Sequence, residues 1–167
     1  VMNNKPDLVI NVVDSSSLER SLLLTLQLRE LGLPVLVVLN KYDVLKRRNQ
    51  SIDTNVLSEK LGCPVVALSA HNRKEVLSFK AILPALIEQT QASQPLDLAY
   101  GKDIDALVGQ MTPQLSHPHL SNRGCALRLL EQDPVVEESM AAQLTASAKQ
   151  QIAQLQKEHD LDLLLAD

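Results

Sequence analysis

The chain has 167 residues with a net charge of −4, and 45% of them are hydrophobic, which suffices for one domain or two small ones with a sizeable core. Only 2% of the residues are aromatic, so aliphatic side chains must fill that core, which favours parallel sheets and helices over a β-sandwich. The acidic balance argues against nucleic acid as a partner. No run reaches the roughly 18 apolar residues of a membrane span.

Three apolar runs, each followed by a helical pattern, fill the first part of the chain. Strands are predicted at residues 7–14, 34–39 and 64–68, and helices at residues 17–32, 53–61 and 75–89. Ser16 and Glu19 form a capping-box pattern, and Gly32 and Gly62 are helix stop signals. The alternation predicts an α/β fold in which right-handed crossovers link parallel strands.

Two of these helices show a clear apolar face. The first is expected to direct a leucine stripe at the core, made of Leu18, Leu22, Leu26 and, just beyond its end, Leu33. The helix at residues 75–89 has its apolar positions at Val76, Phe79, Ile82, Leu83, Leu86 and Ile87. Residues 46–50 are polar and are expected to form a loop or a frayed helix end.

The composition changes at residues 91–95, after which no strand pattern appears. Helices are predicted at residues 96–107, 124–130 and 134–165, with a turn-rich stretch at 112–124. Residues 1–96 contain 11 basic and 9 acidic residues, a net charge of +2, whereas residues 97–167 contain 5 and 11, a net charge of −6. We therefore predict an α/β domain at residues 1–92 and a small all-α domain at residues 93–167.

The two cysteines, Cys63 and Cys125, lie far apart in the sequence. A disulfide framework is typical of shorter chains with more cysteines, so both are predicted to be reduced and buried, in a reducing compartment. Residues 1–5 show no secretory signal.

Polar residues stand where each predicted strand ends. Asp14 ends the first strand, the motif Asn40-Lys41-x-Asp43 follows the second, and Ser69-Ala70 follows the third. The carboxyl ends of parallel strands meet at one edge of a sheet, where such sheets bind ligands. The spacing therefore predicts one site at that edge.

The residue types in this motif suit a guanine base. Guanine offers hydrogen-bond donors at N1 and at its amino group, and the Asp43 carboxylate can accept both. Asn40 can bond the base edge and tie neighbouring loops together, and the aliphatic stem of Lys41 can lie over the base. Backbone N–H groups of Ser69-Ala70 can bond the guanine carbonyl oxygen. The alternative is that Asn40 and Asp43 only cap the following helix.

Other polar clusters carry weaker signals. His117-Pro118-His119 could ligate a metal, but without a visible third ligand it is interpreted as a solvated turn. His71, beside the base loop, is interpreted as an exposed residue rather than a ligand contact. Glu137-Glu138 fits a helix N-terminal turn. Residues 46–48, Lys-Arg-Arg, are interpreted as a solvated face rather than a contact with membrane phosphates.

The sequence contains no phosphate-binding loop. The pattern G-x-x-x-x-G-K-[ST] is absent, and so is any Asp-x-x-Gly for a magnesium-bound water. Stabilisation of phosphoryl transfer rests on those parts. We therefore assign no catalytic or metal residue, and expect the chain alone to be inactive, with weak or absent nucleotide binding. It is expected to be a piece of a longer protein.

Longer stretches of the sequence resemble a known family. Residues 6–45, PDLVINVVDSSSLERSLLLTLQLRELGLPVLVVLNKYDVL, closely resemble the GTPase domain of the FeoB family of bacterial ferrous iron transporters. LSEKLGCPVVALSA (57–70) continues the match, and RGCALRLLEQD (123–133) resembles the helical domain that follows in that family. Two departures stand out: Lys41 replaces a frequent Met, and Ser69-Ala70-His71-Asn72 replaces the commoner Ser-Thr-Arg-Gly.

The resemblance implies a partial P-loop GTPase-type sheet followed by a dissociation-inhibitor-like helical domain. The parent would lie at the cytoplasmic face of the bacterial inner membrane and hydrolyse GTP with Mg²⁺ to drive or gate Fe(II) uptake. By motif match, Asn40, Lys41, Asp43, Ser69 and Ala70 would contact guanine, while phosphate-binding, magnesium-binding and switch residues would lie upstream of Val1. Implied partners are guanine nucleotide, the absent N-terminal half of the GTPase domain, the parent's membrane domain and small cytosolic Feo proteins, but not nucleic acid.

Two rival interpretations remain. One is a fragment of an RNA-associated or other translation-factor-class GTPase, against which the acidic helical segment and the lack of a basic patch count. The other is a non-enzymatic docking module that uses the α/β part as a scaffold.

Overall fold

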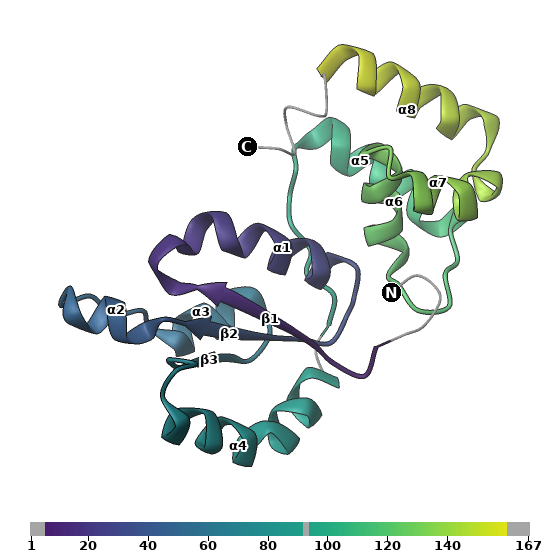
Figure 1. Ribbon diagram of the computed structural model, residues 1–167. Coiled ribbons are helices and arrows are strands. Elements are labelled where there is room, and N and C mark those ends of the chain that lie inside the picture. The colour runs from purple at the N-terminus through teal and green to yellow at the C-terminus, as the bar shows by residue number, and fades with distance from the viewer. Residues whose placement is uncertain (1–5, 92–93, 160–167) are drawn as a thin grey trace. The chain divides into compact units, whose positions relative to one another are not determined.

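The computed structural model describes residues 6–91 and 94–159, which belong to two compact units (Figure 1). The first unit ends at Leu96 and the second begins at Asp97. None of the described helices is both long enough and apolar enough to span a membrane.

A parallel sheet forms the centre of the first unit. Its elements are β1 (Val9–Asp14), the 3₁₀ turn η1 (Ser15–Ser17), α1 (Leu18–Glu30), β2 (Val35–Asn40), α2 (Tyr42–Arg47), α3 (Thr54–Leu61), β3 (Val65–Ala67) and α4 (Arg73–Gln91). The strands lie in the order β1-β2-β3, all parallel, with Val9 opposite Val35 and Val37 opposite Val65. The predicted α/β fold is confirmed.

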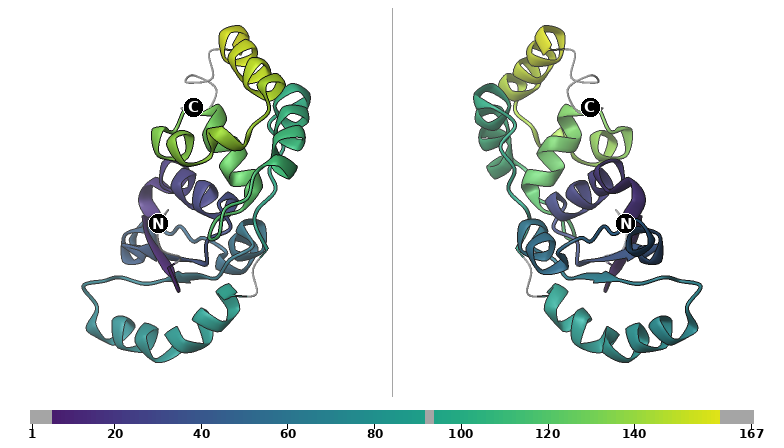
Figure 2. Two further views of the ribbon diagram at one scale, coloured as in Figure 1. Left: turned by 90° about the vertical axis from the view of Figure 1, so that its right-hand side faces the viewer. Right: turned by 90° about the vertical axis from the view of Figure 1, so that its left-hand side faces the viewer.

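Helices cover both faces of this sheet. Because the strands lie side by side in chain order, right-handed crossovers bring α1 and α3 to one face, and α4 lies on the other (Figure 2). Successive side chains of β2 point to opposite faces of the sheet, so they pack alternately toward the helices on one face and on the other. On the α4 face, a buried cluster of Leu36, Val38 and Leu68 packs against Phe79, Leu83 and Leu86.

Strand β1 has an exposed apolar face. Ile10 and Val12 pair in register with Leu36 and Val38, so they point toward the α4 side of the sheet. Their exposed fractions are 41% and 60%, whereas Leu36 and Val38 are buried. Helix α4 therefore covers β2 and leaves the β1 side chains open.

The buried side of α1 differs from the predicted leucine stripe. Leu18, Leu22 and Leu26 are only partly buried, whereas Thr25, Arg29 and Glu30 are buried. Polar contacts draw this side inward, since the Asn11 side-chain amide donates to Thr25 Oγ1 at 2.7 Å. In α4, Ile82 is likewise exposed rather than buried. Within the predicted stripe, Leu33 is fully buried as expected and the other three leucines are so only in part, while the prediction for Ile82 was wrong.

The predicted capping box at Ser16 and Glu19 does not form. The turn η1 separates β1 from α1, so Ser17 is the N-cap of α1, and it makes no side-chain cap bond. Asp14 instead accepts from the Ser16 backbone N–H and caps η1. Gly62, in the left-handed conformation at φ 61, ends α3 as predicted.

Arg29 is fully buried, and its guanidinium bonds to backbone carbonyls. Its guanidinium donates to the carbonyls of Leu61 (3.2 Å), Leu33 (3.3 Å) and Gln94, while its own carbonyl accepts from the Leu96 N–H at 3.2 Å. We call this arrangement the Arg29 clasp. Burial lowers the pKa of Arg29. The clasp fastens the ends of α1 and α3 to the last residues of the first unit.

Cys63 and Cys125 are free and buried, as predicted. Burial raises the pKa of both thiols to about 11, with Arg29 acting weakly against this at Cys63. Both are therefore uncharged side chains of the core near neutral pH.

The second unit is entirely helical in the described residues. Its elements are α5 (Lys102–Met111), the 3₁₀ turn η2 (Thr112–Gln114), α6 (Asn122–Leu130), α7 (Pro134–Met140), the 3₁₀ turn η3 (Ala141–Gln143) and α8 (Ala146–His159). Its core includes Val108, Met111, Cys125, Leu130 and Met140. The prediction of a small all-α part is confirmed.

The first helix of this unit begins later than predicted. Residues 96–101 are not helical, and α5 starts at Lys102. The Asp105 carboxylate accepts from the N–H groups of Tyr100 and Gly101, both at 3.2 Å, and Gly101 has a φ of 105°. These bonds hold an extended backbone up to the helix start.

The predicted long helix at residues 134–165 is broken. Helix α7 ends at Met140 and α8 begins at Ala146, while residues 160–165 lie outside the described residues. In the break, the Gln143 side chain accepts from the Ser116 N–H at 2.8 Å and donates to its carbonyl. These bonds join the break to a residue 27 positions earlier in the sequence.

Candidate functional site

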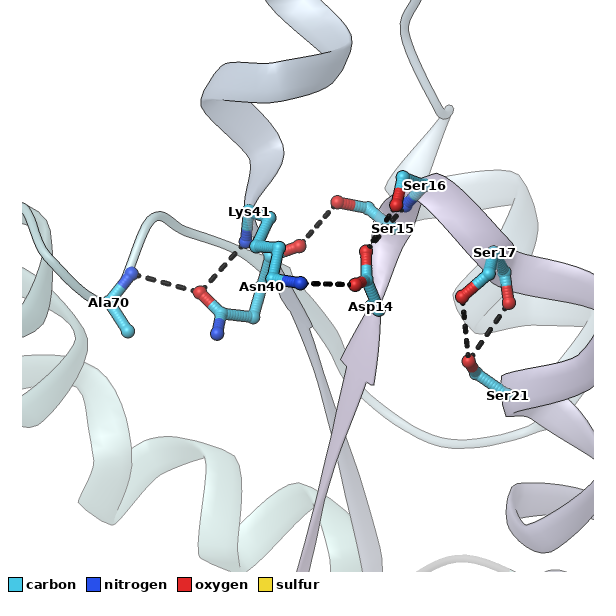
Figure 3. A network of polar contacts seen from close by, with 8 residues as sticks. All are labelled: Asp14, Ser15, Ser16, Ser17, Ser21, Asn40, Lys41 and Ala70. Carbon is cyan, nitrogen blue, oxygen red and sulfur yellow. Dashed lines mark hydrogen bonds and ion pairs between the residues drawn. The ribbon is translucent and has the colours of Figure 1, made fainter.

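The polar residues at the ends of β1 and β2 meet at the carboxyl edge of the sheet (Figure 3). Asp14 and Asn40 are opposite in register, and Lys41 Nζ lies 2.6 Å from Asp14 Oδ2. The other Asp14 oxygen accepts from the Ser16 N–H at 2.9 Å and its hydroxyl at 2.7 Å. Lys41 and Ser16 hold the pKa of Asp14 well below its usual range. The Lys41 side chain is thus directed toward β1.

Asn40 ties the base-motif loop to the loop after β3. Its side-chain oxygen accepts from the N–H groups of Lys41 (2.8 Å) and Ala70 (2.9 Å), as Figure 3 shows. Both bonds use the oxygen, so the NH₂ group is not spent on them and can donate to a base. Lys41 adopts the left-handed conformation at φ 59, which turns the chain from β2 into α2.

Two further bonds join the same loops. The Asp43 N–H donates to Ser69 Oγ at 3.0 Å, and the Tyr42 N–H donates to the Leu68 carbonyl at 3.4 Å. Asn40, Asp43, Ser69 and Ala70, predicted to share one edge, are therefore connected there. Residues 46–50 were expected to form a loop or frayed helix end, and Lys46 and Arg47 are indeed the last two residues of the short helix α2.

The Asp43 carboxylate is flanked by two basic side chains. Arg47 Nη2 lies 2.5 Å from its Oδ2, and His71 Nε2 lies 4.0 Å from the same atom. Its other oxygen, Oδ1, is buried and has no hydrogen-bond partner among the described residues. Burial raises the pKa of Asp43, but Ser69, His71 and Arg47 outweigh it, so the pKa lies below its ordinary value.

Glu75 shapes the loop after β3, which sequence reasoning missed. Its carboxylate accepts from the Ser69 N–H at 2.6 Å and the Asn72 side-chain amide at 2.9 Å. Asn72 Oδ1 accepts from the Lys74 N–H at 3.1 Å at the start of α4. The spacing Asn72-x-x-Glu75 is a capping-box signal that could have pointed to this role.

The helix-cap alternative does not describe these side chains. The N-cap of α2 is Lys41, and α2 has no side-chain cap bond. Asn40 bonds across to Ala70, and the Asp43 carboxylate faces Arg47. The arrangement is therefore a link between two loops with one carboxylate oxygen left unpaired.

A cavity of about 820 Å³ lies beside this edge, between the start of α1 and the residues after α2. Its lining includes Ser16, Arg20, Leu45 and Ile52. None of the five predicted base-contacting residues lines it. The candidate base site is therefore a surface next to this cavity and separate from it.

The His117 side chain accepts hydrogen bonds from the backbone of its own turn. No group of three potential metal-ligating side chains occurs in the described residues 6–91 and 94–159. His117 Nδ1 accepts from the N–H groups of His119 (3.2 Å) and Leu120 (3.1 Å). Glu137 lies in the first turn of α7, as predicted, and His71 is exposed.

The second unit should lose stability as the pH falls from about 7 to about 5. Burial and His119 lower the pKa of His117, so the unfolded chain takes up a proton at a higher pH than the folded chain does. Above the ordinary histidine pKa, His117 is neutral in both the folded and the unfolded chain, so its full contribution to stability is present. Thermal unfolding across this pH range, followed by circular dichroism, measures it.

The matched variant is His117→Asn, whose side-chain oxygen accepts hydrogen bonds without titrating. It should retain stability near pH 7 and lose much of the pH dependence, whereas His119→Asn should keep most of it. An unchanged pH dependence in His117→Asn would contradict the assignment.

Two family models match the chain. The model described as "Ferrous iron transport protein B" matches residues 1–83, and the model described as "FeoB cytosolic helical domain" matches residues 100–167. The chain belongs to the FeoB family. The fold class and the order of the two parts agree with the resemblance found in the sequence.

Curated FeoB relatives match nearly the whole chain. The Fe(2+) transporter FeoB of Legionella pneumophila (strain Lens) is 35% identical over 171 residues, covering 100% of this chain and 22% of that protein. The Fe(2+) transporter FeoB of Salmonella typhimurium (strain LT2) is 33% identical over 165 residues, covering 96% and 20%. The chain thus spans about one fifth of the length of these relatives.

Solved FeoB structures share the fold. The mGMPPNP-bound NFeoB from S. thermophilus is 34% identical with a TM-score of 0.72, covering 92% of this FeoB chain and 57% of that one. The apo cytosolic domain of the T. maritima FeoB iron transporter has a TM-score of 0.73 at 24% identity, covering 94% and 69%, and supports the fold alone.

Proposed function

We propose that this chain is the guanine-reading part, with the helical regulatory domain, of the cytosolic region of a FeoB-type ferrous iron transporter. The link between Asn40 Oδ1 and the Ala70 N–H carries the proposal, because it joins two base-recognition motifs at one edge. The FeoB models that match both parts of the chain favour this family over an RNA-associated GTPase.

In this proposal Asp43 accepts the two guanine donors, and its unpartnered oxygen supports that role. Asn40 donates its NH₂ group to the base edge while its oxygen holds the loops together. The stem of Lys41 covers one face of the base. The N–H groups of Ser69 and Ala70 now donate to Glu75 and Asn40, so the guanine carbonyl oxygen must share or replace those acceptors.

In this proposal, GTP is hydrolysed by a longer protein of which this chain is a part. Residues 1–92 form part of a GTPase domain and residues 93–167 form the dissociation-inhibitor-like domain. The phosphate-binding loop and Mg²⁺ ligands come from sequence outside this chain, and we assign no residue here to Mg²⁺. A phosphate-dependent change of loop order would then drive or gate Fe(II) uptake through the membrane domain, with the chain at the cytoplasmic face of the bacterial inner membrane.

The test compares this chain with the extended protein, by which we mean the chain preceded by the upstream part of its reading frame. GDP, with ADP as the control, is titrated into both by calorimetry. The extended protein should bind GDP and not ADP, and the chain alone should bind GDP weakly or not at all. An extended protein that ignores GDP, or binds ADP equally well, would overturn the proposal.

A further inference from the structure

The candidate base site is already satisfied by its own side chains when no base is bound. Lys41 pairs with Asp14, and Asn40 and Glu75 accept from the Ala70 and Ser69 N–H groups. Two groups differ: the Asn40 NH₂ group is not used in these bonds, and Asp43 has one oxygen engaged and one without a partner among the described residues. Base binding therefore depends in part on what holds the Asp43 carboxylate.

The two Asp43 oxygens lie in unequal surroundings. Oδ2 is held by Arg47 Nη2 at 2.5 Å, whereas Oδ1 is buried without a partner. A bidentate pair with guanine needs both oxygens turned toward the base at once. Because Oδ2 already has Arg47 as its partner, a bidentate pair with guanine would compete with Arg47 for that oxygen.

Arg47 is well placed to hold the resting orientation. It lies four residues after Asp43, a spacing at which opposite charges on a helix stabilise each other. Its side chain is 74% exposed, so the pair can open without disturbing the core. Such exposed pairs are weak, so the restraint is modest and reversible.

We infer that Arg47 is a positioning residue that competes with guanine for the Asp43 carboxylate and so lowers the affinity of this site for guanine nucleotides. This inference rests on the proposed function. When guanine binds, it takes the place of Arg47 at the Asp43 carboxylate. The free energy of the Arg47–Asp43 pair is therefore lost on binding, and the affinity for the nucleotide is lower by that amount.

The chain provides a matched control at the next position. Arg48 carries the same charge and is also exposed, and it follows the last residue of α2. Loss of either arginine removes equal long-range attraction for the phosphates of a nucleotide. A difference between Arg47→Gln and Arg48→Gln therefore isolates the contact with Asp43.

The pair is tested first in the 167-residue chain without nucleotide. The Asp43 carboxyl is titrated by carbon-detected NMR in wild type, Arg47→Gln and Arg48→Gln. Loss of the Arg47 charge should raise the pKa of Asp43 toward its ordinary value, and loss of Arg48 should leave it nearly unchanged. Equal values in all three proteins would overturn the inference.

The competition is then tested in the extended protein by GDP calorimetry. Arg47→Gln should bind GDP about two- to five-fold more tightly than Arg48→Gln. This ratio should approach one as NaCl rises from about 50 mM to about 500 mM, because salt screens an exposed pair. If the substitution acted by changing the structure, the ratio of the two affinities would not fall with the salt concentration.

The outcomes separate this inference from the proposed function. If the extended wild type, Arg47→Gln and Arg48→Gln all ignore GDP, the proposed function fails, and the inference falls with it. If GDP binds but Arg47→Gln equals Arg48→Gln or binds more weakly, the proposed function stands and the competition is wrong. The second result would mean that Arg47 stays beside the bound base.

Discussion

Replacing Asp43 with Asn in the extended protein is expected to lower its affinity for GDP by about 100-fold or more. In the proposed site the carboxylate accepts two charge-assisted hydrogen bonds from guanine, whereas an amide in the same place would turn an N–H donor toward a guanine donor. Xanthine carries a carbonyl oxygen where guanine has its amino group, so xanthosine diphosphate should bind the variant better than GDP does. Calorimetric titration with both nucleotides measures the change.

Asp53→Asn is the matched control for this substitution. Asp53 caps α3 by accepting from the N–H groups of Asn55 (3.0 Å) and Val56 (3.1 Å). The same chemical change there should leave the preference for guanine unaltered. Unchanged GDP affinity in Asp43→Asn would remove Asp43 from the base site.

Replacing Arg29 with Met should destabilise the first unit by about 2–4 kcal/mol. Met approximates the length of the arginine stem but donates nothing, so the carbonyls of the buried residues Leu33 and Leu61, and that of Gln94, lose this donor. Removal of a buried charge offsets part of this cost, because Arg29 has an exposed fraction of 1%. Urea unfolding of the chain gives the free energy of unfolding.

Arg20→Met is the control, since Arg20 lies on the same helix and is exposed. Its effect should stay within about 0.5 kcal/mol. Arg29→Lys retains the charge with a less suitable donor geometry and should be intermediate. If Arg29→Met and Arg20→Met unfold at the same urea concentration, the Arg29 clasp adds nothing to stability.

Pattern and spacing predicted the sheet and the place of the site. The three apolar runs gave parallel strands in chain order, so residues at their ends had to share an edge. The positions of Asn40, Asp43 and Ser69 followed from that topology alone. The helix stop at Gly62 also followed from a local rule, because glycine accepts the left-handed conformation needed there.

Contacts between distant residues could not be predicted in the same way. The buried side of α1 contains Thr25 and Arg29 because specific partners satisfy them, and hydrophobic periodicity takes no account of such partners. In the break between α7 and α8, the Gln143 side chain accepts from the distant Ser116 N–H, a contact that periodicity does not predict. The pairing of Arg47 with Asp43 depends on the short helix α2, for which no bounds were predicted from the sequence.

The Arg29 clasp also bears on the order in which the first unit assembles. Each strand pairs with the next one along the chain, so the sheet can grow one strand at a time during synthesis. Arg29 and Gln94, by contrast, are 65 residues apart, and this contact must wait until the chain beyond α4 has emerged. Until then the guanidinium lacks one of its acceptors and is open to water. We expect closure of the clasp to be a late folding step, and Arg29→Met to speed unfolding far more than it slows folding.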